Sequence, residues 1–294
     1  MQAAGVGPAA TRKALMVLQG IFSCAVNWGH VQSNPVVGVR KPSAKRQRAV
    51  TPPSPAVVER MRGELLAAGQ LRDATLVSVL AYAGLRPQEA LGLPWSNVRG
   101  RTLLIDRAQS DEGLKDTKTG GTRSVRLLAP LVADLAAWRL ASDRSGADDL
   151  VFPTGSGELW RDYDWANWRR RVFDPLAASV GVSGMRPYDL RHAFCSLLIG
   201  EGMSVVEVAR QAGHAPTMTL ATYAHVIADL QDGERVSAEA SIRAAREAEV
   251  SGKCPPRATP PPAENENPSV LGMGDPGLEP GTSSLSEKRS NRLS

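Results

Sequence analysis

The sequence predicts a mainly α (α+β) fold, in which helices surround one small antiparallel sheet. Apolar residues recur three and four positions apart through most of the chain, which is the spacing of amphipathic helices. Between Thr102 and Leu128 the spacing changes to alternation, which is typical of strands. Proline-rich stretches at 41–55 and 251–294 interrupt both patterns and mark boundaries of the folded part.

The first predicted element is an amphipathic helix over residues 11–33, with Thr11 as a candidate N-cap and Asn34-Pro35 as its end. A single helix cannot bury its apolar face alone, so this segment is interpreted as part of a small helical domain. A basic linker follows, and it carries Arg40, Lys41, Lys45, Arg46 and Arg48. Charge pattern alone leaves two interpretations open, a solvated linker or a strap that neutralises DNA phosphates.

From Ser54 onward helices alternate with a short β region. The predicted helices cover 56–68, 72–83, a short stretch after Pro87, 129–142, 162–179, 189–200, 204–212 and 217–228. The predicted strands are TLLI from Thr102, a hairpin over 114–128 that turns at Gly120-Gly121, and Leu150–Phe152. Residues 251–294 hold eight prolines and few large apolar side chains, which predicts disorder.

Composition places the chain among ordinary globular proteins, with 42% hydrophobic and 22% charged residues in 294. The net charge of +5 indicates an anionic partner only weakly. No apolar run is long enough for a membrane span and no signal peptide is evident, so we expect a cytoplasmic protein. The odd set of Cys24, Cys195 and Cys254 fits neither a disulfide framework nor a zinc site.

Four segments carry the residue types that a phosphodiester exchange needs. Such a reaction requires a nucleophile, an acid for the departing oxygen, and donors for the non-bridging oxygens, where arginine is well suited. The segments are AYAGLRPQEALGL around Arg86, the glycine turn beside Lys118, MRPYDLRHAF around Arg191, and ARQAGHAPTMTLATY, which contains His214 and Tyr223. Each residue alone is more typical of a solvated or packing side chain, and the order and spacing together favour a site.

Local pattern also predicts details within these segments. Glu89 lies on the same helical face as Arg86 and could support a neighbouring group. Asp189 is a candidate cap for the helix that begins at Leu190, and Arg191 is expected to point outward from its first turn.

In this order, the segments resemble the tyrosine recombinases, also called phage integrases. The matching motifs are GLRPQE at 84–89, KTGGTRSVRL at 118–127, YDLRH at 188–192, AGH at 212–214 and Tyr223, nine residues after His214. The resemblance spans most of residues 50–230.

The resemblance implies a tyrosine-recombinase-like helical catalytic domain preceded by the remnant of a core-binding domain. The implied plan is a partial core-binding domain and basic linker at 1–48, a catalytic domain at 49–232, a helix at 233–250 and a disordered tail at 251–294. Family members usually carry more sequence before this point, so we expect an N-terminally shortened chain.

The resemblance further implies that Tyr223 attacks DNA to form a 3′-phosphotyrosyl link. Arg86 and Arg191 would grip the phosphate, Lys118 would protonate the leaving 5′-oxygen, and His214 would donate a hydrogen bond. No cofactor or metal is implied. Tyr188 stands where histidine is usual; it can donate a hydrogen bond but is a poor base near neutral pH. His192 is interpreted as a structural helix residue, and His225 has no assigned role.

The implied partners are double-stranded DNA attachment sites, a homotetramer on DNA, and accessory DNA-bending or directionality proteins. The segment 226–250 would pass to a neighbouring subunit or form a solvated helix. A terminal run that looks like the read-through of a transfer-RNA gene indicates a bacterial mobile element, and we expect the protein on the nucleoid. Two alternatives stay open: a truncated DNA-binding relic without catalysis, and a type IB topoisomerase-like activity.

Overall fold

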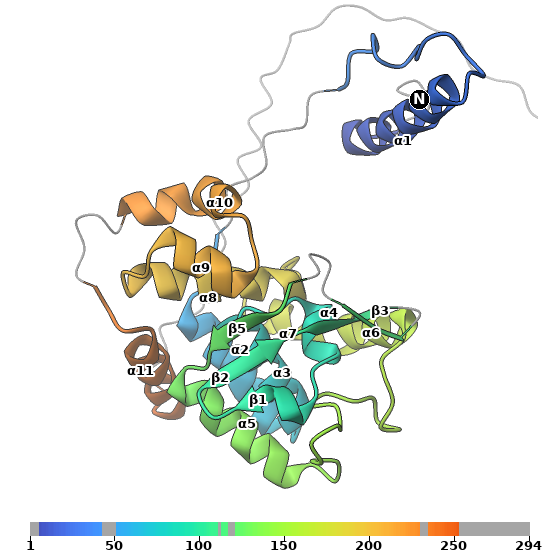
Figure 1. Cartoon of the computed structure of the whole chain (residues 1–294). Helices are drawn as coiled ribbons and strands as arrows, with labels where there is room; N and C mark the ends of the chain where they lie inside the picture. The colour runs from blue at the N-terminus through green and yellow to red at the C-terminus, as the bar shows by residue number, and fades with distance from the viewer. Residues whose placement is uncertain (1–5, 43–50, 111–112, 117–120, 230–234, 253–294) are drawn as a thin grey trace, which may run out of the picture. The chain divides into compact units, whose positions relative to one another are not determined.

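The computed structural model of the chain describes residues 6–42, 51–110, 113–116, 121–229 and 235–252 (Figure 1). All of them belong to one unit, Met1–Ala258. Within these described residues, no helix is long and apolar enough to cross a membrane. The expected boundary between 48 and 49 lies outside them, and so does the expected disordered tail at 251–294 except for its first two residues.

Helix α1 (Pro8–Asn27) is shorter at its C-terminal end than predicted. Gly7 is its N-cap, and the hydroxyl of the predicted cap Thr11 instead donates to Gly7 O at 3.2 Å. Asn34 does not end the helix. Its side-chain amide donates to Gln19 O at 2.9 Å and so holds the following segment against α1.

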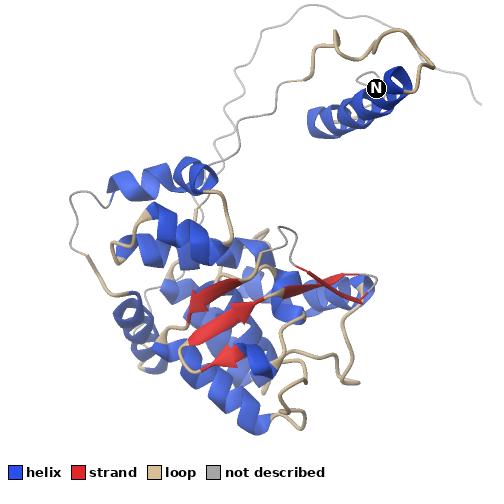
Figure 2. Ribbon diagram, viewed as in Figure 1, coloured by secondary structure: helices blue, strands red, loops and turns tan. Residues whose placement is uncertain are grey.

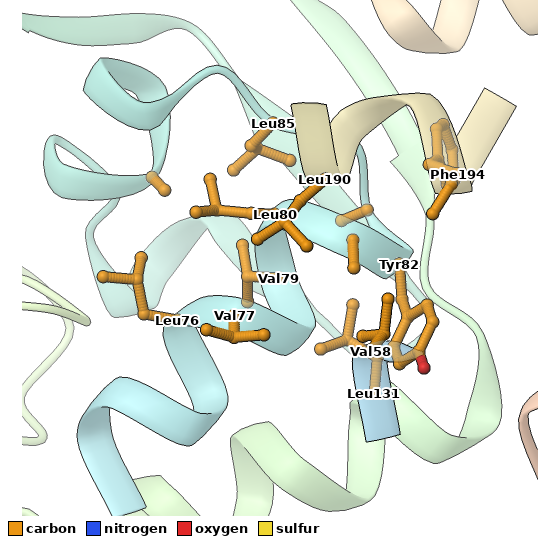
Figure 3. Close-up of a cluster of buried hydrophobic side chains, with 14 of the residues drawn as sticks. Val58, Leu76, Val77, Val79, Leu80, Tyr82, Leu85, Leu131, Leu190 and Phe194 are labelled. Carbon is orange, nitrogen blue, oxygen red and sulfur yellow. The ribbon is translucent and has the colours of Figure 1, made fainter. Parts of the chain in front are cut away.

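Helix α3 (Leu71–Tyr82) lies at the centre of the core. It packs against α2 (Pro55–Ala67), α5 (Ala129–Ala141) and α8 (Leu190–Gly200). Every residue from Asp73 to Tyr82 is buried, which explains its nearly continuous apolar sequence. Figure 3 shows α3 side chains clustered with others from the three neighbouring helices, among them Val58, Leu131, Leu190 and Phe194.

The small antiparallel sheet consists of β1 (Val98–Arg99), β2 (Thr102–Ile105) and β5 (Arg123–Arg126), in the order β1-β2-β5 (Figure 2). Its buried side chains are Leu103, Ile105, Arg123 and Val125. A separate pair is formed by β3 (Arg107–Ser110) and β4 (Gly113–Asp116).

The hairpin predicted over 114–128 is wrong. Strand β4 pairs with β3, whereas β5 pairs with β2, so the two predicted arms belong to different sheets. Alternation of apolar residues determines which face of a strand is buried but not which strand it pairs with. The predicted strand Leu150–Phe152 is also wrong, because only a single bridge joins Leu150 to Pro94.

The remaining helices lie where the apolar spacing predicts them. They are α4 (Pro87–Leu91), α6 (Asp162–Trp168), α7 (Asp174–Ser179), α9 (Val205–Ala212) and α10 (Pro216–Asp229). Helix α11 (Ala238–Val250) follows them in the chain. Two 3₁₀ turns, η2 (Trp95–Asn97) and η4 (Pro187–Asp189), precede β1 and α8. The predicted helix 162–179 is interrupted by a π-helical turn, η3 (Arg169–Phe173).

The C-terminal helix α11 packs against α2, α5 and α8 of its own chain. Its residues Ala238 and Ile242 are fully buried. Of the two alternatives given for residues 226–250, a solvated helix is wrong for one face of α11, because that face joins the core of the same chain.

Candidate active site

Three arginines from distant segments bond to three consecutive carbonyl groups at the C-terminal end of α9. The pairs are Arg123 Nε to Gln211 O at 2.9 Å, Arg191 Nη2 to Ala212 O, and Arg86 Nη2 to Gly213 O at 2.8 Å. The last carbonyls of a helix have no partner within it and carry the negative end of its dipole. They therefore draw the three guanidinium groups together around one point.

Gly213 makes this helix end possible. Its backbone lies in the left-handed region, at φ 66° and ψ 45°, which glycine adopts without strain. A Cβ atom at this position would lie 3.2 Å from the side chain of Arg123. Glycine therefore permits both the end of α9 and the close approach of the arginine.

Arg86 lies between the core helix α3 and the short helix α4. Its Nη1 donates to Glu89 Oε1 at 2.7 Å, and the Glu89 carboxylate also accepts from the Arg86 backbone at 2.8 Å. The side chain of Arg86 keeps about a quarter of its surface exposed, at 24%. Glu89 thus supports Arg86, as its position on the same helical face predicted.

Glu89 also holds Arg123 in a buried bidentate ion pair. Arg123 Nη1 and Nη2 donate to the two carboxylate oxygens at 2.9 and 2.6 Å. Burial alone would raise the pKa of Glu89, but the bonds and charges of Arg123 and Arg86 outweigh it and lower that pKa to about 2. One ionised carboxylate thus faces three guanidinium groups, and the cluster keeps a net positive charge.

Arg191 is buried, with only 1% of its surface exposed, so the expectation that it points outward from α8 is wrong. Its guanidinium donates to the carbonyls of Gly84 and Ala212. Burial lowers the pKa of Arg191, and the nearby charge of Arg86 acts in the same direction. Its Nε is buried without a hydrogen-bond partner, which is costly unless a further acceptor binds there.

The same region holds His214, directly after Gly213. Its Nδ1 is also buried without a partner. Burial lowers the pKa of His214 to about 3, with the charges of Arg191 and Arg86 adding to the effect. His214 is therefore neutral at physiological pH in this structure.

The phenol of Tyr223 lies on α10 and is fully buried. Its hydroxyl lies 2.6 Å from Nδ1 of His192, on the neighbouring helix α8. Burial raises the pKa of Tyr223, and the adjacent Cys195 thiol acts in the same direction. His192 thus touches the candidate nucleophile, in contrast to its interpretation as a purely structural residue.

Tyr188 lies in the turn before α8 and keeps 38% of its surface exposed. Its ring meets that of His192 edge to face, with 6.1 Å between centroids. Asp189 does not cap α8 with its side chain. Its carboxylate instead accepts from the Arg186 backbone and guanidinium at 2.9 and 2.8 Å.

Several predicted residues lie outside this cluster or outside the described residues. Lys118 and three residues of the basic linker, Lys45, Arg46 and Arg48, belong to the undescribed segments. Arg40 and Lys41 are exposed, and Lys41 donates to Gln19 Oε1 at 2.8 Å. Among the described residues no group of three or more His, Cys, Asp or Glu side chains could hold a metal ion.

Sequence reasoning missed Arg123 as a site residue. Arg123 has the same parity along β5 as the buried Val125, so alternation places a charged side chain on the buried face. A charge in that position almost always has a partner, and this signal was present in the sequence.

A cluster of guanidinium groups with unused donors lies next to a neutral histidine and a tyrosine hydroxyl. These groups define the class of site, which is one for an anionic phosphate ester.

Comparison with known proteins supports this class of site. The model of the phage integrase family matches residues 55–229. The tyrosine recombinase XerD of Mycobacterium leprae is 30% identical over 237 residues, covering 75% of this chain and 70% of that protein. XerC of Xylella fastidiosa is 28% identical over 247 residues, covering 83% and 78%.

Solved structures share the fold. The Tn1549 transposon integrase in complex with a circular intermediate DNA has a TM-score of 0.63 at 18% identity, covering 76% of this chain and 78% of the other. A lambda integrase dimer bound to a COC′ core site has a TM-score of 0.53 at 16% identity, covering 77% and 75%. The chain belongs to the phage integrase family, the tyrosine recombinases, and its enzyme class is that of the site-specific DNA recombinases.

Proposed function

We propose that this recombinase is an integrase that cuts and rejoins DNA through a 3′-phosphotyrosyl intermediate on Tyr223 and serves the integration of a mobile element. The observation that carries the proposal is the convergence of Arg86, Arg191 and His214 at the end of α9, where the buried Nε of Arg191 is a donor without a partner. A phosphate group would satisfy it.

In the proposed complex, Arg86 and Arg191 bind the two non-bridging oxygens of the scissile phosphate. Each guanidinium has five N–H donors, and backbone carbonyls and Glu89 take only part of them. His214 and Tyr188 donate further hydrogen bonds to the phosphate. Arg123 and Glu89 do not reach the substrate in this proposal but hold Arg86 in place.

The chemical step is a transesterification. The Tyr223 oxygen attacks phosphorus, the bond from phosphorus to the 5′-oxygen breaks, and Lys118 gives the leaving oxygen its proton. A free 5′-hydroxyl from a partner duplex then reverses the step and releases Tyr223. Since the phosphotyrosyl bond conserves the ester energy, the exchange needs no nucleotide hydrolysis, metal or cofactor.

The proposed partners are two double-stranded DNA attachment sites, a homotetramer assembled on them, and accessory DNA-bending or directionality proteins. The DNA complexes named for the Tn1549 and lambda integrases support the DNA partner. We assign residues 1–48 to a helical core-binding segment and linker, 49–232 to the catalytic domain, and 233–250 to a C-terminal helix. Exposed Arg40 and Lys41 support contact of this linker with phosphates. Such a protein would work on the bacterial nucleoid.

The test uses a nicked duplex that carries a candidate attachment site, so that the cleaved fragment dissociates and traps the intermediate. We expect a covalent protein–DNA complex on denaturing gels with the natural chain and none with Tyr223→Phe. Salt-sensitive DNA binding without any covalent complex would contradict the proposal and favour a DNA-binding protein without catalysis. Relaxation of supercoiled DNA lacking an attachment site would instead favour a topoisomerase.

A further inference from the structure

The contact between Tyr223 and His192 has a specific geometry. The phenolic oxygen and Nδ1 of the imidazole lie 2.6 Å apart, and the ring centroids are 5.7 Å apart at an interplanar angle of 57°. The two residues come from different helices, α10 and α8, which pack against each other. The packing of these two helices therefore places an imidazole nitrogen within hydrogen-bond distance of the Tyr223 oxygen, which is the nucleophile of the proposed reaction.

Both partners are neutral near pH 7. Burial lowers the pKa of His192 below its usual 6.5; the charges of Arg191 and Arg186 act in the same direction, and only Asp189 opposes them. Burial also raises the pKa of Tyr223, so the phenol keeps its proton. A neutral imidazole has one nitrogen lone pair free, and at this distance a phenol O–H can donate to it.

We propose that His192 is a catalytic residue of strand cleavage, whose Nδ1 accepts the phenolic proton of Tyr223 as its oxygen attacks phosphorus. This inference rests on the proposed function, in which Tyr223 is the nucleophile. The step balances: the O–H bond breaks, the oxygen–phosphorus bond forms, and the proton moves to Nδ1. On rejoining, the imidazolium returns that proton as Tyr223 leaves.

The position of His192 in the chain keeps it at the reaction centre. The charge of Arg191, which we assign to the phosphate, acts on both His192 and Tyr223, and the Tyr223 oxygen already contacts α8 through His192. Tyr188 cannot serve as this base, since an unperturbed phenol loses its proton only near pH 10. His214 follows α9, and in the proposal it donates to the phosphate and not to Tyr223.

The first experiment compares single-turnover cleavage of the nicked duplex by the natural chain and by His192→Asn. Asparagine keeps a hydrogen-bonding atom near Nδ1 but takes up no proton at neutral pH. We expect a rate loss of about 10²-fold or more at pH 7. The loss should shrink as the pH rises, because solvent base then replaces the imidazole. His192→Gln serves as the second variant, and equal DNA affinity and melting temperature show that each variant is folded.

A second substrate separates the two proton transfers. A duplex whose leaving 5′-oxygen is replaced by sulfur needs no acid, because a thiolate leaves unprotonated. Lys118→Ala is the matched control, and we expect this substrate to restore its rate. His192→Asn should stay slow on the same substrate, because its defect lies on the attacking side.

The outcomes separate this inference from the function on which it rests. A covalent complex that survives in Tyr223→Phe, or is absent from the natural chain, contradicts the proposed function. If folded His192→Asn cleaves DNA at pH 7 as fast as the natural chain, the proposed role of His192 is wrong and the proposed function is unaffected. Rescue of His192→Asn by the sulfur substrate also overturns it. If neither variant folds, the test uses the natural chain alone. Its cleavage rate on the sulfur substrate is expected to fall as the pH drops below 6.5. A cleavage rate that does not depend on pH overturns the inference.

Discussion

Arg123 on β5 and Glu89 on α4 form a bidentate ion pair in which both side chains are less than one-tenth exposed. The pair joins the small sheet to the loop that carries Arg86, and Arg123 also caps the end of α9. Without Arg123, the buried Glu89 carboxylate would keep only Arg86 as a charged partner, and without Glu89 the buried Arg123 would lose its carboxylate.

Removal of one partner of this pair should destabilise the fold. We expect Arg123→Ala to lower the free energy of unfolding by about 3–5 kcal/mol, measured by denaturant titration. The matched control is Arg210→Ala, which breaks an exposed ion pair with Glu207 and should cost at most about 1 kcal/mol. If both substitutions lowered the free energy of unfolding equally, the buried pair would contribute no more to stability than the exposed one.

The pKa of Glu89 predicts how stability depends on pH. This pKa is about 2 in the folded chain, below the ordinary 4.5. The carboxylate therefore contributes about 3 kcal/mol that is present above pH 4.5 and is lost as the pH falls toward 2. Unfolding free energies between pH 6 and 2 should show the loss in the natural chain. In Glu89→Gln, which has no carboxylate at this position, the pH dependence should be shallower by this amount.

Tyr188 stands in the position where the family pattern has histidine, and its role can be tested through its hydroxyl. We expect Tyr188→Phe to slow single-turnover cleavage by about 10²-fold, since one donor to the phosphate is lost. Tyr188→His should retain cleavage, because an imidazole also donates. Tyr163→Phe on α6 removes an exposed hydroxyl and is the control. If Tyr188→Phe cleaved DNA as fast as the natural chain, a contact between the Tyr188 hydroxyl and the phosphate would be excluded.

Helix α11 is held by Arg246, which donates to Glu59 Oε2 at 3.0 Å and to Asp134 Oδ2 at 2.6 Å. Both carboxylates are almost fully buried. We expect Arg246→Ala to lower the free energy of unfolding by about 1–3 kcal/mol and to increase proteolysis around α11, because the bonds of Arg246 are lost while Arg62 still pairs with both carboxylates. Arg243→Ala on the same helix breaks only an exposed pair with Glu239 and should change stability little. Unchanged proteolysis in Arg246→Ala would mean that apolar packing alone holds the helix.

The spacing of apolar residues along the chain correctly predicted those features that depend on short-range interactions. Helices α2, α3, α5, α8 and α9 begin and end within about two residues of the predicted positions, because apolar spacing and caps act over a few residues. The support of Arg86 by Glu89 followed from the same short-range reasoning. The order of the motifs was sufficient to indicate the family.

The amino-acid sequence by itself thus determined the helices, the family and the list of candidate site residues. Only the tertiary structure decided how the strands pair, that Arg191 is buried, that Arg123 belongs to the site, and that His192 touches Tyr223. The physical reason is that each of these features joins atoms from segments far apart in the chain. Periodicity shows which side of an element is buried, whereas packing of the whole core determines what that side meets.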